Sequence, residues 1–541
     1  NLERRGPHMT RPNTAEIFTA QIPALKLLKT LGWEYVTPAA CMEMRGGAQH
    51  VVLKPLLIKA LSQRTFDYKG KTYPLSNNAI DQIVRELTAP RLQEGLGPAN
   101  EALYNKLVYG VTVTEFVGGK AHSATIPIID WSKDGYASGN IFTVTEEFEV
   151  LAVDGTRHRR PDIVCFVNGL PLAVIEAKRP DSGNPNTSML DEGISQTIRN
   201  QKPDEIPHLF AYSQLLLSIN GADGRYGTAR TPKKFWAKWR EEILTDEGFD
   251  RLKNAPAPEP QDTLLRERPQ EVRDQMQAYF SAPQLVTDQD RLLISLLSRD
   301  RFLEFMRYFI FFDRKLGKIA ARYQQVFGIK ALLARIAGTD KNGTRNGGVI
   351  WHTTGSGKSF TMVLLCKALL MEAALAQSRI IVVTDRIDLE KQLSRTFASS
   401  GALGLTAAPK DAKAKSGRDL AKRIGSGKER ILFSTVQRFS SAVKSHEAKN
   451  DSDKLIVLID EGHRSHSGES HERMRLALPK ASFIAFTGTP LLKKNKTENK
   501  FGPIVHPYSM QRAVEDGGPA LGRGIEGQLF APMPMTLSFA L

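Results

Sequence analysis

The feature that most constrains the fold is a series of short apolar runs in the second half of the sequence. They are GGVIW (347–351), RIIVVTD (379–385), RILFST (430–435), LIVLIDE (455–461) and SFIAFTGTP (482–490). Each run is almost continuously apolar, as expected of a strand that is buried on both faces, and helical segments separate the runs. The sequence therefore predicts an α/β unit with a doubly wound parallel sheet covered by helices on both sides.

A chain of 541 residues is too long for one hydrophobic core, so we expect two or three domains. Residues 10–225 mix helical and strand patterns, which predicts a separate α/β domain ahead of the parallel sheet. Residues 226–317, which contain the stretch APAPEP, are expected to be a linker and helical connector, and residues 318–515 the parallel-sheet domain. Residues 1–9 resemble an expression scar and residues 516–541 an irregular tail.

The composition excludes several classes of protein. No apolar run approaches the roughly 20 residues of a membrane-spanning helix, and the three cysteines are far apart, without a Cys-x-x-Cys pair. This cysteine usage argues against a zinc site or a disulfide framework and favours a reducing compartment, which we take to be the cytoplasm. The formal charge of +16 favours a polyanionic partner such as nucleic acid.

The first apolar run leads into a glycine-rich loop and a helical segment, in VIWHTTGSGKSFTMVLL at 349–365. Backbone N–H groups of such a loop converge on a phosphate at the start of the helix. The loop residues expected to form this cradle are Thr354, Gly355, Ser356 and Gly357. Lys358 is placed to neutralise the terminal phosphates of ATP and Ser359 to ligate Mg²⁺, whereas His352 stands where the strict pattern has its first glycine.

An acidic pair follows the fourth run, where the sequence reads DEGHRS. In an ATP-hydrolysing site Asp460 would hold Mg²⁺ through water, and Glu461 would orient the attacking water. Acidic residues at strand ends are common, but the position of this pair after the phosphate loop and before FTGTP favours the catalytic interpretation.

These segments together resemble superfamily 2 helicases. HTTGSGKS, TDR, STVQ, DEGHRS and FTGTP occur in the order of motifs I, Ia, Ib, II and III, with Gly462 in place of the alanine of the DEAH pattern. The resemblance implies a RecA-like fold and an adenine-reading Gln325 within RYQQ. It also implies that the nucleic-acid backbone lies near Asp385, Arg386, Thr435 and Gln437. Thr487 and Thr489 would couple the state of ATP to the bound strand.

A second pattern lies upstream, in RPDIVCFVNGLPLAVIEAKRP at 160–180. Asp162, Glu176 and Lys178 fit the PD-(D/E)xK nuclease pattern, in which two carboxylates hold Mg²⁺ against the scissile phosphate. The lysine of such a site orients water and stabilises developing negative charge. The alternative is an ion-pair cluster at a sheet edge, because this spacing also occurs by chance. The motor motifs downstream favour the nuclease.

The geometry of this predicted hairpin provides a test. A two-residue Asn168–Gly169 loop would place Asp162 opposite Ile175, on the wrong face of the sheet for Glu176. A three-residue loop of residues 167–169, with Gly169 left-handed in a G1 bulge, would place Asp162 on the face of Glu176 and Lys178. The nuclease interpretation therefore predicts an odd-length loop or an equivalent bulge.

The combination resembles the restriction (motor) subunit of type I restriction–modification enzymes over roughly residues 10–515. The resemblance implies that Gln196 belongs to the nuclease site, although Asn200 replaces the tyrosine of the family's Gln-x3-Tyr element. A carboxylate on an N-terminal helix often joins such sites, and Glu16 is the candidate here.

The resemblance implies the following fold and function. The fold would be a PD-(D/E)xK nuclease-like α/β domain followed by a RecA-like domain of the superfamily 2 helicase type. The chain would pump duplex DNA with ATP and cut it with Mg²⁺, together with methyltransferase and specificity subunits. Because motifs IV to VI are absent from the sequence, we expect an N-terminal fragment with little ATPase activity of its own. The rival is a non-cutting helicase or remodeller with an N-terminal binding domain.

Overall fold

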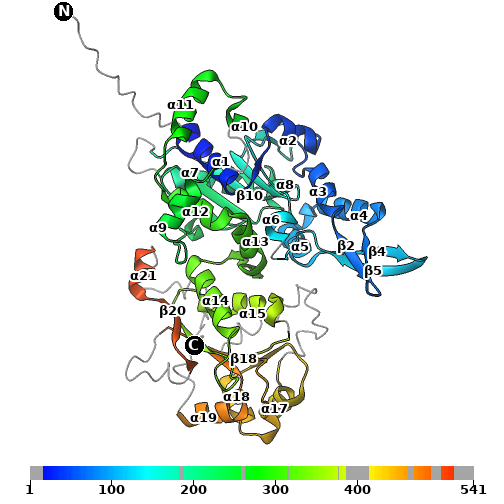
Figure 1. The fold of residues 1–541 in the computed structure, drawn as a ribbon, viewed down its shortest axis with the longest axis vertical. Coiled ribbons are helices and arrows are strands. Elements are labelled where there is room, and N and C mark those ends of the chain that lie inside the picture. Colours follow the sequence, from blue (N-terminus) through cyan, green and yellow to red (C-terminus); the bar gives the residue numbers. More distant parts are fainter. Residues whose placement is uncertain are drawn as a thin grey trace, which may run out of the picture. The chain divides into compact units, whose positions relative to one another are not determined.

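The computed structural model describes residues 16–132, 135–181, 188–256, 262–313, 316–375, 377–384, 413–460, 468–488 and 501–516. The chain divides into two compact units, residues 1–320 and residues 321–541 (Figure 1).

A mixed sheet forms the centre of the first unit, in the order β1-β6-β9-β10-β11-β12. Its strands are β1 (Glu34–Tyr35), β6 (Phe142–Glu146), β9 (Ile163–Val167), β10 (Leu170–Ala177), β11 (Leu215–Ile219) and β12 (Gly224–Gly227). The neighbours β1 and β6 are parallel, as are β10 and β11, and the other neighbouring pairs are antiparallel. Strands β9 and β10 are buried along their whole length, so both faces of the sheet are covered at its centre.

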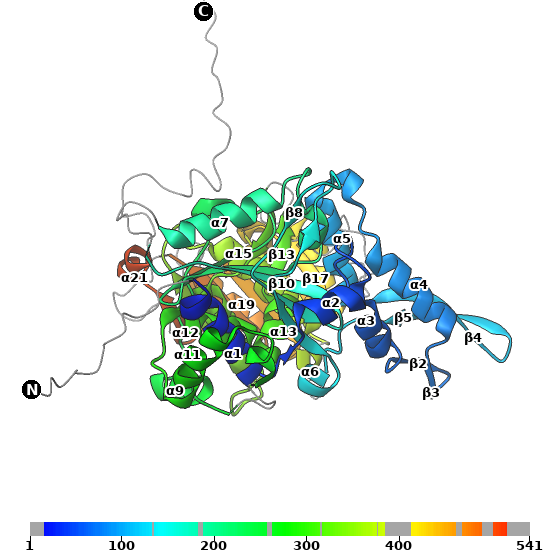
Figure 2. The ribbon, with the colours of Figure 1, turned by 90° about the horizontal axis from the view of Figure 1, so that it is seen from above.

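Helices cover both faces of this sheet. The helices of the first unit are α1 (Ile22–Thr30), α2 (Pro38–Arg45), α3 (Lys54–Leu61), α4 (Asn77–Thr88), α5 (Leu96–Tyr109), α6 (Gly135–Ser138), α7 (Met189–Asn200), α8 (Pro207–Phe210), α9 (Asp246–Lys253), α10 (Asp262–Leu265), α11 (Gln270–Ser281), α12 (Asp288–Leu297) and α13 (Arg299–Tyr308). Helix α7 lies on one side of the sheet, and α1 and α12 lie on the other (Figure 2).

Small hairpins complete the first unit. Their strands are β2 (Thr65–Tyr68), β3 (Lys71–Pro74), β4 (Val111–Val117), β5 (Lys120–Ile126), β7 (Val150–Leu151), β8 (His158–Arg159), β13 (Ile310–Asp313) and β14 (Gly317–Ala320).

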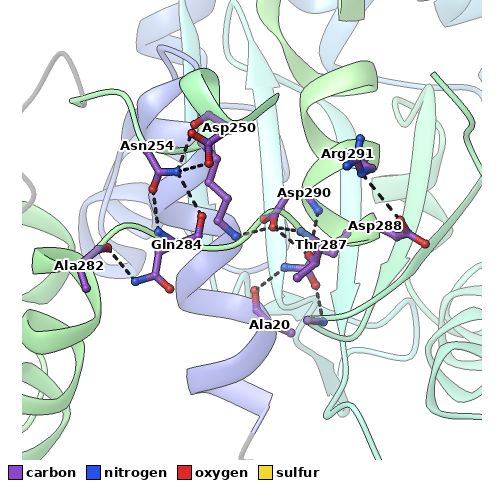
Figure 3. A network of polar contacts seen from close by, with 12 residues as sticks. Ala20, Asp250, Asn254, Ala282, Gln284, Thr287, Asp288, Asp290 and Arg291 are labelled. Carbon is purple, nitrogen blue, oxygen red and sulfur yellow. Dashed lines mark hydrogen bonds and ion pairs between the residues drawn. The ribbon is translucent and has the colours of Figure 1, made fainter. Parts of the chain in front are cut away.

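Residues 226–317, which the sequence predicted to be a linker and helical connector, belong to the first unit, and their described residues pack against it. The indole N–H of Trp33 donates to the carbonyl of Leu297 over 2.8 Å. Asp290, at the start of α12, receives hydrogen bonds from the backbone N–H and hydroxyl of Thr287, both over 2.8 Å, and an ion pair from Lys253 of α9 (Figure 3). The helices on either side of the proline-rich stretch, α9 and α12, are therefore joined by this ion pair rather than separated by a free linker.

The second unit is the predicted parallel α/β sheet. Its strands run in the order β17-β16-β18-β19-β15-β20, and every neighbouring pair is parallel. The strands are β15 (Gly348–His352), β16 (Arg379–Val383), β17 (Ile431–Ser434), β18 (Leu455–Asp460), β19 (Ser482–Thr487) and β20 (Ile504–Tyr508). The helices are α14 (Tyr323–Ile336), α15 (Lys358–Met371), α17 (Gly417–Ser426), α18 (Val436–Ala442), α19 (Gly468–Ala477) and α21 (Met510–Glu515).

Among the helices of the described residues, none is both long and apolar enough to cross a membrane.

Candidate functional site

The hairpin of β9 and β10 resolves the question of which face Asp162 occupies. The loop has two residues, Asn168 and Gly169, with φ of 52° and 78°, and Leu170 pairs with Val167. The predicted three-residue loop is therefore wrong. Between Pro171 and Ala173, however, the register shifts by one residue, so that Leu172 forms a β-bulge.

This bulge is the equivalent that the nuclease interpretation required. Beyond it Ala173 pairs with Cys165 and Ile175 with Ile163, and one further step along the ladder places Asp162 opposite Glu176. Directly opposed residues of antiparallel strands share a face, and Lys178 shares that face because strand side chains alternate with a period of two.

The side chains of this triad meet in a buried cluster. The Lys178 ammonium lies 3.5 Å from Asp162 Oδ2 and 3.8 Å from Glu176 Oε2. Asp162 Oδ2 also accepts a hydrogen bond of 2.7 Å from the backbone N–H of Ala177. Two carboxylates therefore face one ammonium at the end of a central strand.

Helix α7 supplies the predicted glutamine. The Gln196 side-chain amide donates to Glu176 Oε2 over 2.9 Å. The helix can approach the sheet closely because a Cβ at Gly193 would lie 2.4 Å from Ser218 Oγ and 3.4 Å from the side chain of Lys178. Asn200, where the family pattern has tyrosine, is buried and its Oδ1 has no hydrogen-bond partner.

Glu16 also reaches the cluster, with Oε2 3.9 Å from the Lys178 ammonium. A π-helical turn, Ile17–Gln21, follows it directly, and the Gln21 amide donates to Glu146 Oε2 over 2.9 Å and to Glu147 Oε1 over 3.0 Å. Glu147 has a left-handed backbone (φ 47°), and its N–H donates to the carbonyl of Asp162. Gln21 thus joins the Glu16 helix to the segment beside Asp162, and nothing in the sequence pattern had singled it out.

The carboxyls of the cluster outnumber its one ammonium, so their charged forms are disfavoured. Burial, followed by the charge of Asp162, raises the pKa of Glu176 well above its usual range, although Lys178 opposes the shift. Burial raises the pKa of Glu16 to about 7, again against the effect of Lys178. Burial alone would lower the pKa of Lys178, but the three carboxylates outweigh it and the pKa is raised, so the lysine remains a cation.

The donor set of this cluster suits a divalent cation. Glu176 is fully buried, and its Oε1 has no hydrogen-bond partner. Carboxylate oxygens are the ligands that Mg²⁺ prefers, with several positions kept for water or substrate phosphate. No three acidic, His or Cys side chains of the described residues converge as a complete metal cage, so the remaining ligands would have to be water or phosphate.

The phosphate loop of the second unit lies between the end of β15 and the start of α15. Gly355 and Gly357 have φ of 82° and 87°, a backbone that other residues adopt with strain. Gln325 is tied to this loop, since its amide donates to the Gly357 carbonyl over 3.1 Å and accepts from the Arg322 N–H over 2.9 Å. Lys358 and Ser359 are buried at the start of the helix.

Two residues near this loop had not been singled out from the sequence. A Cβ at Gly488, within FTGTP, would lie 3.0 Å from both the Lys358 ammonium and Thr354 Oγ1. Thr384, at the end of β16, donates to Asp460 Oδ2 over 3.2 Å. Both lie within or beside motifs that the sequence did identify, and their contacts depend on the order of the strands in the sheet.

The histidine at the first position of the loop pattern is a core residue. His352 Nε2 lies 2.9 Å from His506 Nδ1 on the neighbouring strand β20, and the ring packs beside Gly328 of α14. Burial, together with nearby His506 and Lys358, keeps the pKa of His352 well below its usual range. The departure from the strict pattern therefore fills space between β15, β20 and α14.

The remaining predicted residues fall into two groups. Thr435 caps α18 by accepting from the Arg438 N–H over 3.3 Å, Gln437 is exposed on that helix, and Thr487 is buried at the end of β19. Glu461, Asp385, Arg386 and Thr489 lie outside the residues that the structure describes.

Comparison with known proteins matches both units to families. Residues 13–235 match the family described as the type I restriction enzyme R protein N terminus, and residues 324–519 match the SWI2/SNF2 ATPases.

The whole chain also has relatives of similar organisation. It is 31% identical over 523 residues to the Type I restriction enzyme HindI endonuclease subunit of Haemophilus influenzae. The alignment covers 91% of this chain and 44% of that protein. It is 27% identical over 392 residues to the SsaAORF53P endonuclease subunit of Staphylococcus saprophyticus, covering 70% of this chain and 35% of that protein. The chain thus spans less than half the length of these curated relatives.

Among solved structures, the Hef helicase domain of Pyrococcus furiosus aligns over 35% of this chain and 37% of that one. The sequence identity is 16% and the TM-score 0.26.

Proposed function

Because the chain belongs to the family of type I restriction enzyme endonuclease subunits, we propose that its first unit is a Mg²⁺-dependent endonuclease and its second unit the ATP-binding part of a DNA motor. The enzyme would translocate duplex DNA with ATP and cut it, in a complex with methyltransferase and specificity subunits. The observation that carries this proposal is the Leu172 bulge, which places Asp162, Glu176 and Lys178 on one face.

The proposed nuclease chemistry assigns a role to each side chain of the cluster. Asp162 and Glu176 would hold Mg²⁺, which when bound polarises the scissile phosphate and lowers the pKa of water. Lys178, which remains a cation, would stabilise the negative charge that develops on the phosphate. Gln196 would orient Glu176 through its 2.9 Å hydrogen bond. Glu16, whose pKa is about 7, would accept a proton near neutral pH.

The rival function treats the same cluster as a structural ion pair. A buried ion pair contributes little to stability unless its lone pairs are satisfied. Here Asp162 and Glu176 share one ammonium, and the buried Glu176 Oε1 has no partner. A cluster whose carboxylates lack enough cationic partners favours a cation site over a structural device.

A divalent cation is expected to raise the melting temperature of the chain more at about pH 8 than at about pH 5.5. The pKa of Glu176 is raised well above its usual range and that of Glu16 to about 7, so folding takes up protons above the ordinary carboxyl value, up to about 7 for Glu16. Without metal, stability therefore falls as pH rises through this range, because the charged forms are disfavoured in the folded state. A cation binds the deprotonated carboxylates and restores this stability at high pH.

Thermal melts with Mg²⁺ or Ca²⁺ at the two pH values would measure this effect. Glu176→Gln should remove the difference, whereas the exposed Glu94→Gln should not. Equal metal-induced shifts at both pH values, or shifts that survive Glu176→Gln, would contradict the assignment of the metal site.

In the second unit, Lys358 would neutralise the terminal phosphates of ATP, and Ser359 and Asp460 would hold its Mg²⁺. Glu461, outside the described residues, would orient the attacking water. Gln325 would read the adenine, because it is already tied to the loop through Gly357.

Lys358→Ala is expected to weaken ATP binding by about 10- to 100-fold, because it removes a charge-assisted contact to phosphate. Anisotropy of a fluorescent ATP analogue would measure this in the isolated chain, with the exposed Lys480→Ala as control. In the assembled complex the same variant should lose ATP-dependent cleavage of duplex DNA. Cleavage that remains ATP-dependent in the Lys358 variant would refute the proposed motor site.

A further inference from the structure

Two β-hairpins extend together from the first unit, away from its central sheet (Figure 2). We call them the hairpin arm, defined as β2–β3 (residues 65–74) and β4–β5 (residues 111–126). Each ends in a two-residue turn with positive φ at both positions, Lys69–Gly70 and Gly118–Gly119. Such turns match the natural twist of the strands, so the arm extends as two regular ribbons.

Aromatic rings join the two hairpins into one body. Tyr68 of β2 packs on His122 of β5 with ring centroids 4.9 Å apart, and Phe66 stacks on His122 at 6.0 Å and on Tyr73 at 5.7 Å. These ring contacts hold the two hairpins, and hence their two turns, in a fixed position relative to each other.

The inner face of β4–β5 accounts for the fold of the arm. Val111, Val113, Ala124 and Ile126 are buried on this face. Glu115 is also buried there, and its carboxylate accepts from the N–H of Ser76, the N-cap of α4, over 2.9 Å. The inner face is thus committed to packing.

The outer face is different, because every residue on it is exposed and none is charged. It consists of the cross-strand pairs Thr112–Thr125, Thr114–Ser123 and Phe116–Ala121. Phe116 is 70% exposed. An uncharged exposed ribbon invites pairing with other chains, and proteins usually protect such a ribbon with charges on its face. This face therefore presents hydroxyl groups and one exposed aromatic ring, without charge, to a partner.

The charge of the arm is concentrated at its turns. Lys69, Lys71 and Lys120 are exposed there, and Lys69 lies over the Tyr68 ring at 5.5 Å. The exposed carboxylate nearby, Asp67, accepts a hydrogen bond of 2.6 Å from Thr72. The three lysines at the turns are complementary in charge to a polyanion, and the uncharged face of β4–β5 does not repel it.

We propose that the hairpin arm binds duplex DNA along a groove, with its lysines on the flanking phosphates. A two-stranded β-ribbon fits the major groove, and hydroxyl groups such as those of the outer threonines donate to phosphate oxygens. The arm adds a contact site that lies outside both the nuclease cluster and the phosphate loop. It rests on the proposed function in that duplex DNA is the substrate.

The test is the salt dependence of duplex binding by the chain, without metal or ATP. Each lysine–phosphate contact contributes about 0.9 to the slope of log affinity against log salt. Replacing Lys69, Lys71 and Lys120 together by alanine should flatten the slope by about 2 to 3 and weaken binding about 10- to 100-fold at about 0.1 M salt. Fluorescence anisotropy of a labelled duplex of arbitrary sequence would measure both quantities.

Two further variants make the result specific. Phe116→Ala should weaken binding a few-fold while leaving the slope unchanged, because it removes a contact without removing charge. A matched control replaces three exposed cations elsewhere by alanine, Lys202, Arg251 and Lys341, and should change the slope by less than about 1. Circular dichroism would show that each variant is folded.

The outcomes separate this proposal from the proposed function. An unchanged slope in the triple-lysine variant would overturn the arm proposal, while metal binding by the nuclease site and ATP binding by Lys358 would still be measured on their own. Unchanged DNA affinity with lost assembly of the restriction complex would also overturn it, by assigning the arm to a partner protein.

Discussion

Lys178→Ala is expected to lower DNA cleavage by the assembled complex by about 10²- to 10³-fold while leaving its ATP hydrolysis unchanged. Lys178 is the one cation that the described residues place within 4.0 Å of Asp162, Glu176 and Glu16. Losing a preorganised group that stabilises charge in the transition state costs a rate factor of about this size. Plasmid cleavage and phosphate release, measured in the same reaction, would give the two rates.

A measurement of metal binding distinguishes a catalytic role of Lys178 from a structural one. Removal of the ammonium leaves three carboxylates that repel one another, so a divalent cation should bind the variant at least as well as the parent chain. Preserved binding of Ca²⁺ with lost cleavage would therefore separate a catalytic lysine from a structural one. Lys202→Ala, an exposed lysine just beyond α7, is the control and should leave both rates unchanged. Loss of cleavage and ATP hydrolysis together would favour the structural ion pair.

Asp290→Ala is expected to destabilise the first unit by about 3–5 kcal/mol, because it leaves the buried Lys253 ammonium without its anionic partner. Asp290 also accepts from the N–H and hydroxyl of Thr287, so its half of the capping box at the start of α12 is lost with it (Figure 3). Urea unfolding followed by tryptophan fluorescence would report mainly on this unit. Four of the five tryptophans, Trp33, Trp131, Trp236 and Trp239, lie in it.

The neighbouring Asp288 provides a matched control on the same helix. Its side chain is 65% exposed and lies 4.0 Å from Arg291, so Asp288→Ala should cost less than about 1 kcal/mol. Similar small effects of the two substitutions would show that residues 246–297 contribute little to the stability of the first unit. That result would restore the interpretation of this region as a connector.

The second unit was predictable because its signal is local and repeated. Each apolar run is long enough to be a strand but too short for a helix. The predicted Asp460 is the last residue of β18, and the predicted Lys358 begins α15 after the loop that follows β15. In a parallel sheet the carboxyl ends of the strands lie at one edge, so the order of motifs nearly determines the site.

The nuclease hairpin was predictable in its residues but not in its register. Every residue of β9 and β10 is buried, so no alternation of polar and apolar residues reveals which face Asp162 occupies. The Asn168–Gly169 pair correctly indicated a two-residue turn, but the bulge at Leu172 reverses the face that this turn would give. The need for Asp162 to share a face with Glu176 required a bulge somewhere in the hairpin, but it did not determine the position of that bulge.

Long-range contacts account for the rest of what the sequence did not reveal. Lys253 and Asp290 are separated by residues that read as a linker, and their ion pair is invisible to any local pattern. Gln21 lies five residues after Glu16, a spacing that separates two side chains by about 140° on an α-helix. The π-helical turn of residues 17–21 changes this angle, and π-turns are too rare to be expected from composition.

The Leu172 bulge also imposes a rule on insertions and deletions in this hairpin. A change of one residue between the turn and Glu176 turns the carboxylate to the opposite face of the sheet, whatever the substituted residues are. A change of two residues keeps the face but slides Glu176 about 6–7 Å along its strand, away from Asp162. In a homologous hairpin that keeps this chemistry, an insertion or deletion in one strand must therefore be matched by an equal one in the other strand.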